Sequence, residues 1–212
     1  MNSMQVKDKL KNISKKKNIP FNMALKFYIF DRFLVRLASS KYKDNFILKG
    51  GFVLSSWFGI ENRSTMDIDS MVTNVDFTEE NILKMIDEII SINIDDSVTF
   101  YREKVGLIRE DDEYGGYRLY LLFSFDTIKE KLILDIATGD KITPTAIHYK
   151  HKVMLENNYV NLWSYNIETV IAEKLETIFS KVELSSRMKD YYDIYLIYSK
   201  QWQNIDKDNL KE

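Results

Sequence analysis

Cysteine is absent from the 212 residues, and the chain has only two prolines and seven glycines. The lack of cysteine excludes disulfides, thiolate metal sites and cysteine nucleophiles, and it fits an intracellular protein. So few prolines and glycines leave little material for disordered linkers. Apolar residues make up 45% of the chain, including 13 Tyr, 12 Phe and 3 Trp, which predicts one sizeable hydrophobic core.

Long hydrophobic runs are also missing. No apolar stretch approaches the roughly 18 residues that span a bilayer, and residues 1–12 lack the apolar core of a signal peptide. We therefore expect a soluble, cytoplasmic protein without membrane contact. Histidine is scarce as well: His148 and His151 stand three apart in a lysine-rich stretch with no evident third metal ligand, so both are predicted to be exposed rather than to bind zinc.

Neither positive nor negative charge is in large excess, because 30 Lys and Arg residues nearly balance 32 Asp and Glu residues and leave a formal net charge of −2. Bulk electrostatics therefore do not favour a polyanion, and any contact with nucleic acid has to be local. The segment Lys7–Lys17 is one candidate, because it contains six lysines and only one acidic residue, Asp8. Such a segment is equally well explained as the solvated face of a helix.

The spacing of apolar residues predicts an α+β fold in which a small mixed sheet is flanked by helices. We expect an N-terminal helical segment over 1–43, a core over 44–155 and a C-terminal helical region over 156–212. The predicted helices are 5–16, 21–40, 52–58, 79–93, 167–181 and 188–200, the last two separated by Ser185-Ser186. The predicted strands are 46–48, 67–73, an antiparallel meander of 97–109, 117–126 and 130–138 with a turn over 111–116, and, more weakly, 146–154.

Two aspartates in the strand 67–73 are candidates for metal binding. Asp67 and Asp69 are two apart, so their carboxylates point to one face of the strand with Cα atoms about 6.5 Å apart. Two carboxylates that share a site repel each other unless a cation neutralises them, and oxygen ligands select Mg²⁺ or Mn²⁺. Taken alone, the pair is more simply the exposed face of a half-buried strand with Ile68 inside.

Two further features support a site. Gly50-Gly51 lies between a short strand and a helix, where backbone N–H groups can receive phosphate oxygens without obstruction by side chains. Asp135 lies within the apolar strand 130–138, where an unpaired charge costs several kcal/mol. It therefore needs a partner, either a metal shared with Asp67 and Asp69 or a salt bridge to a lysine or arginine.

The stretch Lys49–Asp69, KGGFVLSSWFGIENRSTMDID, followed by the strand aspartate Asp135, resembles the nucleotidyltransferase fold of the DNA polymerase β superfamily. Within that superfamily the likeness is closest to the AbiEii/AbiGii-type toxin nucleotidyltransferases of toxin–antitoxin and phage abortive-infection systems, which include the MenT enzymes. It extends from about Pro20 to Tyr198 and includes the C-terminal blocks IAEKLETI and RMKDYYDIY. An ordered series of blocks of this length is a specific match.

The resemblance implies roles for particular residues. Asp67, Asp69 and Asp135 would hold the metals, and Asp135 would help to deprotonate the acceptor hydroxyl. Lys174, in the first C-terminal block, would contact the nucleotide phosphates, or else be a surface lysine. Nearby acidic residues in the second block would support the site or orient that lysine, or else pair on the helix surface with Lys189 and Arg187; these are Asp190 and Asp193.

The glycine turn departs from the superfamily pattern. Many members carry Ser or Thr directly after the glycines, whereas this chain has Phe52. A hydroxyl contact to phosphate is therefore lost or supplied by Ser64 or Thr65, and Arg63 is placed to compensate electrostatically. Together with Gly50 and Gly51, these three residues form the expected nucleotide-binding set. The family usually continues beyond the last matched helix, which leaves open a truncated C-terminal region.

The function implied is a toxin with nucleotidyltransferase activity, which moves a nucleotide from an NTP to an acceptor by an in-line, two-metal reaction with Mg²⁺ or Mn²⁺. The toxin resemblance favours RNA, in particular tRNA, as the acceptor and implies a cognate antitoxin. Two alternatives stay open: a non-catalytic module of the same fold that binds nucleotide or a partner, and a metal-dependent phosphohydrolase. The sequence specifies neither the base of the NTP nor the acceptor.

Overall fold

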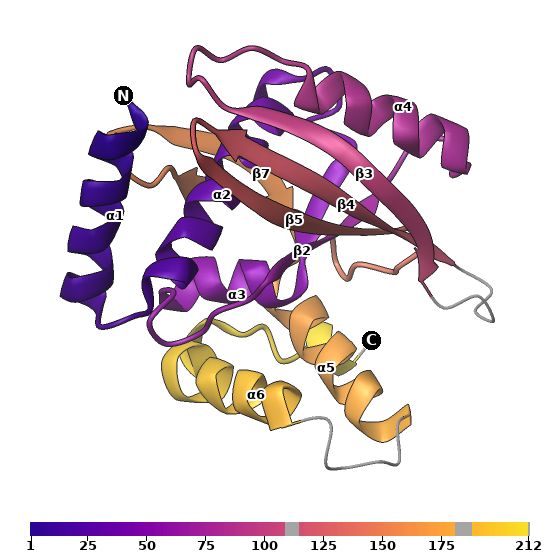
Figure 1. The fold of residues 1–212 in the computed structure, drawn as a ribbon. Coiled ribbons are helices and arrows are strands. Elements are labelled where there is room, and N and C mark those ends of the chain that lie inside the picture. The colour runs from indigo at the N-terminus through magenta and orange to yellow at the C-terminus, as the bar shows by residue number, and fades with distance from the viewer. Residues whose placement is uncertain (109–114, 181–187, 212) are drawn as a thin grey trace. The chain divides into compact units, whose positions relative to one another are not determined.

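A computed structural model describes residues 1–108, 115–180 and 188–211, and its fold is shown in Figure 1. The chain forms two compact units. The sheet unit comprises Met1–Asp140 and His148–Trp163, and the helical unit comprises Lys141–Ile147 and Ser164–Glu212.

A seven-stranded mixed sheet is the centre of the sheet unit, with the strand order β3-β4-β5-β2-β1-β7-β6. β2 pairs with β5 in parallel, whereas β1–β2, β3–β4 and β4–β5 are antiparallel. The parallel pair places two strands that are far apart in sequence side by side in the middle of the sheet. The strands are β1 (Phe46–Lys49), β2 (Asp67–Val72), β3 (Thr99–Ile108), β4 (Gly116–Phe125), β5 (Ile128–Ala137), β6 (Ile147–Lys152) and β7 (Tyr159–Ser164).

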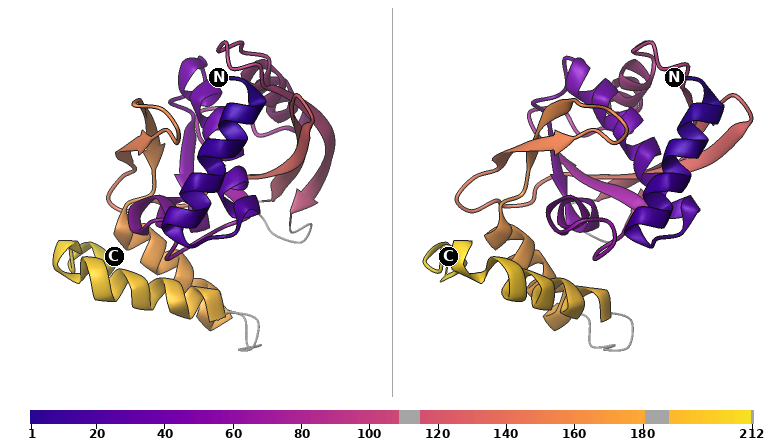
Figure 2. Two further views of the ribbon diagram at one scale, coloured as in Figure 1. Left: turned by 60° about the vertical axis from the view of Figure 1, so that its left-hand side comes forward. Right: turned by 90° about the vertical axis from the view of Figure 1, so that its left-hand side faces the viewer.

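Helices cover one face of this sheet. Residues of α2 (Phe21–Ser39) and α4 (Glu79–Ile90) share a buried core with the inward-facing residues of the strands. α1 (Ser3–Lys17) contributes Val6 and Leu10 to the same core and packs against α2 (Figure 2). α3 (Gly50–Phe58) follows β1 directly and contacts β1 and β2. The opposite face of β2 and β5 is therefore the one that carries the polar side chains discussed below.

The helical unit contains α5 (Ile167–Ser180) and α6 (Met188–Gln201), followed by the short 3₁₀ helices η2 (Trp202–Asn204) and η3 (Asn209–Lys211). Asn166 connects the start of α5 to the segment before β6. Its side chain accepts a hydrogen bond from the Thr169 N–H (2.8 Å) and donates to the carbonyls of Thr143 (2.8 Å) and Thr145 (2.9 Å). None of the described helices has both the length and the apolar character that a bilayer crossing requires.

The mixed α+β architecture and the antiparallel meander β3–β4–β5 confirm the predictions. β7 was not predicted. α4 ends at Ile90 rather than Asn93, where the Asn93 side chain instead accepts a hydrogen bond from the Asp95 N–H (3.0 Å) and so competes with the helix. Most of the predicted turn over 111–116, as well as Ser185-Ser186, Lys181 and Arg187, lies outside the described residues.

The predicted exposure of the two histidines is correct for His148 and wrong for His151. His151 is only 7% exposed, because it lies on the inward face of β6 opposite α2. Its Nε2 is 2.7 Å from Asp31 Oδ1, and the same aspartate accepts a hydrogen bond from the Met154 N–H. A buried partner that is 120 residues away in the sequence satisfies this histidine.

Candidate active site

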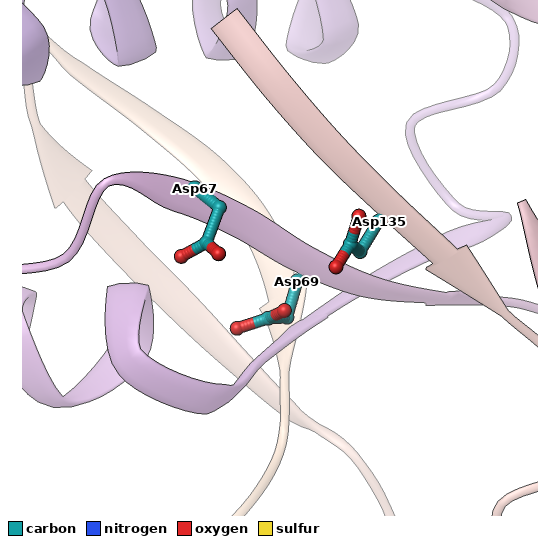
Figure 3. Close-up of side chains that lie close together, drawn as sticks. All are labelled: Asp67, Asp69 and Asp135. Carbon is teal, nitrogen blue, oxygen red and sulfur yellow. The ribbon is translucent and has the colours of Figure 1, made fainter. Parts of the chain in front are cut away.

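Three carboxylates converge on the polar face of the sheet (Figure 3). Asp67, Asp69 and Asp135 each offer one oxygen, and these oxygens all lie within 4.8 Å of one another. All three side chains are half-buried. We call this group the carboxylate triad.

The backbone accounts for this convergence. Asp67 and Asp69 alternate with Ile68, which is fully buried in the core, so both carboxylates point to the opposite face of β2. On β5, Asp135 alternates with the buried Leu134 and Ile136 in the same way, so its carboxylate also points away from the core. The parallel register of β2 and β5 places Asp69 directly beside Asp135.

Asp135 also has a cationic partner. Arg118, on β4, donates two hydrogen bonds to its carboxylate, from Nε to Oδ1 (2.8 Å) and from Nη2 to Oδ2 (2.6 Å). The hydrogen bonding raises the pKa of Arg118 above its usual value. Of the two partners anticipated for Asp135, the structure shows the salt bridge, and the same carboxylate also belongs to the triad. Because the Arg118 side chain is 42% exposed, this salt bridge carries little stabilising energy of its own.

The glycine turn adjoins the triad. Gly50 has a φ of +62°, and a Cβ atom at this position would lie 2.4 Å from Asp69 Oδ2. A Cβ atom on Gly51 would lie 3.0 Å from both Arg63 Nη2 and Thr65 Oγ1. Only glycine at these positions lets the start of α3 approach the carboxylates so closely. No side chain caps this helix, so its first N–H groups point toward a site where anions are favoured.

The loop before β2 brings the other predicted residues to the same place. Thr65 Oγ1 donates a 2.6 Å hydrogen bond to Asp67 Oδ1, and Arg63 donates to the Ser64 carbonyl. Phe52 is fully buried and its ring packs against those of Phe27 and Phe30, so it is a core residue. Of the two hydroxyls proposed to replace the missing one, that of Thr65 lies against the glycine turn, 3.0 Å from the Cβ position of Gly51.

The donor set of the triad fits a hard divalent cation. Three carboxylate oxygens within 4.8 Å of one another match the oxygen ligands that Mg²⁺ and Mn²⁺ prefer. The repulsion among three like charges also favours a bound cation. The identity of the ion does not follow from this geometry.

The predicted residues of the C-terminal blocks come together within the helical unit. Lys174 Nζ, on α5, is 2.8 Å from Asp190 Oδ1 and 3.5 Å from Asp193 Oδ2, both on α6. Lys174 is only 14% exposed and Asp193 is fully buried. Burial lowers the pKa of Lys174, but the hydrogen bond to Asp190 and the nearby negative charges outweigh this effect and leave the pKa above 10.5. The two aspartates thus hold the lysine in place.

Sequence analysis missed several cations around the triad. Arg118 is one, and Lys49 is another: it lies opposite Asp69 in the β1–β2 register and forms a 2.6 Å ion pair with Asp140. A third is Lys26 on α2, whose pKa is lowered by burial, while the charges of Glu130 and Asp67 act to raise it. Each belongs to a different element from the carboxylate that it accompanies, so no local pattern identifies it.

The fold is that of nucleotidyltransferases. A structure of JHP933 from Helicobacter pylori shares 16% sequence identity with the chain at a TM-score of 0.56, and the match covers 84% of this chain and 68% of that one. An antigenic nucleotidyltransferase-like protein from Paracoccidioides brasiliensis gives 14% identity and a TM-score of 0.51, with 82% and 76% covered. At such identities the likeness shows the fold alone. The comparison with curated proteins gave no match.

The family follows from the sequence. Residues 32–212 match the family described as "Nucleotidyl transferase AbiEii toxin, Type IV TA system". Since this match covers most of the chain, the protein belongs to the AbiEii family of nucleotidyl transferase toxins from type IV toxin–antitoxin systems. The resemblance inferred from the sequence is thereby confirmed.

Proposed function

We propose that this protein transfers a nucleotide from an NTP to an acceptor, with Mg²⁺ or Mn²⁺ bound by the carboxylate triad. The observation that carries the proposal is the convergence of Asp67, Asp69 and Asp135 beside the uncapped N-terminus of α3. Carboxylates would hold the cations, and backbone N–H groups would receive phosphate oxygens. Membership of a nucleotidyl transferase family supports the same chemistry.

The proposed reaction is an in-line displacement at the α-phosphorus, in which the acceptor oxygen forms the new P–O bond as the bond to pyrophosphate breaks. Bound divalent cations would supply positive charge at the acceptor and leaving oxygens. Asp135 would help to deprotonate the acceptor hydroxyl. Gly50, Gly51, Arg63, Ser64 and Thr65 would position the triphosphate, so the protein would contribute orientation and charge rather than a nucleophile.

The C-terminal blocks and the partners are part of the same proposal. Lys174, oriented by Asp190 and Asp193, would neutralise charge on the nucleotide phosphates. The acceptor would be an RNA, with tRNA as the first to test, and a cognate antitoxin would counteract the activity. The support for these partners is the description of the family as a type IV toxin–antitoxin toxin.

Incubation of the purified protein with each of the four NTPs, labelled at the α-phosphate, together with Mg²⁺, total RNA and total protein tests the proposal. We expect label in RNA, release of pyrophosphate, and loss of both after chelation of the metal. Label released as nucleoside monophosphate would indicate a phosphohydrolase. If all label stays in the NTP while nucleotide binding is detectable, the protein is a binding module and the proposal fails.

A further inference from the structure

The edge strand β6 carries a row of cationic side chains on one face. His148, Lys150 and Lys152 alternate along the strand and are exposed, whereas Tyr149 and His151 between them are turned inward. β6 is the last strand in the sheet order, so its outer edge and this face are open to solvent over the described residues. The β6–β7 hairpin is orange in Figure 2.

The neighbouring strand β7 adds aromatic rings to the same face. Val160 and Leu162 are buried in the core, so Tyr159 and Trp163 point outward with the cations of β6. The rings of His148 and Trp163 pack with centroids 3.7 Å apart and a tilt of 31° between their planes, and Lys150 Nζ lies 4.7 Å from the centre of the Tyr159 ring. These five residues, His148, Lys150, Lys152, Tyr159 and Trp163, form what we call the cationic ribbon.

The local charge of this hairpin is positive in a chain with a net charge of −2. Glu156 is the only acidic residue between 146 and 163, and its carboxylate is held 2.6 Å from Arg32. Asp44 is also close to the ribbon, since it accepts a 3.2 Å hydrogen bond from Trp163 Nε1. Neither Lys150 nor Lys152 forms an ion pair with another described residue, and Lys150 lies over the ring of Tyr159.

The cationic ribbon and the carboxylate triad lie on the same face of the sheet. The buried residues of β7 share one core with Ile68 of β2 and Leu134 of β5, so the residues that alternate with them all project from the opposite face. Three interstrand steps separate β6 from β2, which at about 4.8 Å each is about 14 Å. A chain molecule bound along β6 would thus lie on the same face of the sheet as the carboxylates, three strands away from them.

We propose that the cationic ribbon binds single-stranded nucleic acid. Lys150 and Lys152 would contact phosphates, and the exposed ring of His148, which packs against that of Trp163, would receive an unpaired base. Paired bases are not available for such stacking, so a duplex is the poorer ligand. The role of the ribbon in holding an acceptor for the triad rests on the proposed function. The binding of nucleic acid by the ribbon does not depend on that function.

Lysines on an edge strand also have a simpler explanation, because they discourage pairing with the edges of other sheets. The exposed ring of His148, which packs against Trp163 beside these lysines, is not needed for that purpose. Removal of the ring and removal of the charges can therefore be tested separately.

The test is fluorescence anisotropy of a fluorescein-labelled single-stranded RNA of about 12 nucleotides, titrated with protein over a KCl series without NTP. For the double variant Lys150→Gln/Lys152→Gln, we expect the slope of log K against log salt to become shallower by about 1.4, because each phosphate contact to a single strand contributes about 0.7. His148→Ala should weaken binding at least about fivefold, whereas His148→Phe, which keeps a ring, should bind like the parent.

The matched control is Lys84→Gln/Lys104→Gln, which removes the same charge from exposed positions on α4 and on β3, the strand at the opposite edge of the sheet from β6. It should bind like the parent. An equal loss of RNA affinity in the control and in the ribbon variants would mean that only general electrostatics is at work, and it would overturn the inference. Parental affinity in all ribbon variants would overturn it as well. If the parent transfers nucleotide to a protein or small molecule but binds no RNA, the ribbon assignment fails and the proposed transferase activity survives.

Discussion

At the scale of single residues, the close approach of Gly50 to Asp69 is the strictest requirement of the site. A Cβ atom at Gly50 would lie 2.4 Å from the carboxylate oxygen, and the φ of +62° is costly for other residues. We expect Gly50→Ala to lower the free energy of unfolding by about 1–2 kcal/mol, as measured by chemical denaturation. Displacement of Asp69 by about 1 Å should reduce nucleotide transfer by about a hundredfold.

Gly106 provides the control for this prediction, because a Cβ atom there would meet nothing within 4 Å. Gly106→Ala should leave both stability and transfer close to the parental values. Parental transfer by Gly50→Ala would contradict the view that the glycine turn and Asp69 form one site.

Sequence could predict the carboxylates of the triad but not their surroundings. The alternation around Ile68 is local, and so is the isolation of Asp135 in an apolar strand, so both are visible in a few residues. The partner of Asp135 is different: Arg118 lies 17 residues away and meets it only through the β4–β5 register. The burial of His151 depends in the same way on Asp31, which is supplied by α2.

At the scale of elements, α5 and α6 are joined by the contact of Lys174 with Asp190 and Asp193. Lys174→Ala should reduce kcat/KM at least tenfold, or about 1.4 kcal/mol of transition-state stabilisation. It should also destabilise the fold, because it removes the ammonium group that lies 3.5 Å from the buried Asp193 carboxylate. Steady-state kinetics and thermal unfolding of the same preparation would measure both effects.

Asp193→Asn separates the two effects, because it disturbs the same contact but keeps the ammonium beside Asp190. We expect this variant to lose stability but to lose less activity than Lys174→Ala. Equal kcat/KM losses in the two variants would make Lys174 a structural residue only. Since the pKa of Lys174 is raised above 10.5 in the folded state, its contribution to stability should be present throughout neutral pH and decline only as the pH rises above about 10.5.

The elements themselves could be predicted where hydrophobic spacing and turn residues coincide, as at Gly50-Gly51 between β1 and α3. β7 was missed although its burial alternates along Tyr159–Ser164. The strand is short, it follows a loop without glycine or proline, and two of its three outward residues are aromatic, so its alternation of polar and apolar residues is weak in the sequence. Its pairing beside β1 depends on residues far away in the sequence, so the local pattern of the segment cannot predict it.

At the scale of the whole molecule, the proposed activity and the proposed binding of nucleic acid both depend on one surface of the sheet unit. The core and its helices occupy one face, and the triad, the glycine turn and the cationic ribbon are on or beside the other. The carboxylates of the triad contribute little to the core, so they can be changed without loss of packing. The carboxylates repel one another when no metal is bound, so the parent protein without metal should be no more stable than the variants in which one of them is replaced by Asn.

Transfer of α-labelled nucleotide by Asp67→Asn and Asp69→Asn, measured with thermal unfolding of the same samples, tests the central claim most directly. The exposed Asp95→Asn serves as the control. We expect both triad variants to lose Mg²⁺-dependent transfer, because a metal ligand is removed, while their melting temperatures without metal stay the same or rise. Asp95→Asn should behave like the parent. Transfer at the parental rate by a folded Asp67→Asn or Asp69→Asn variant would contradict the assignment of the triad as the catalytic metal site.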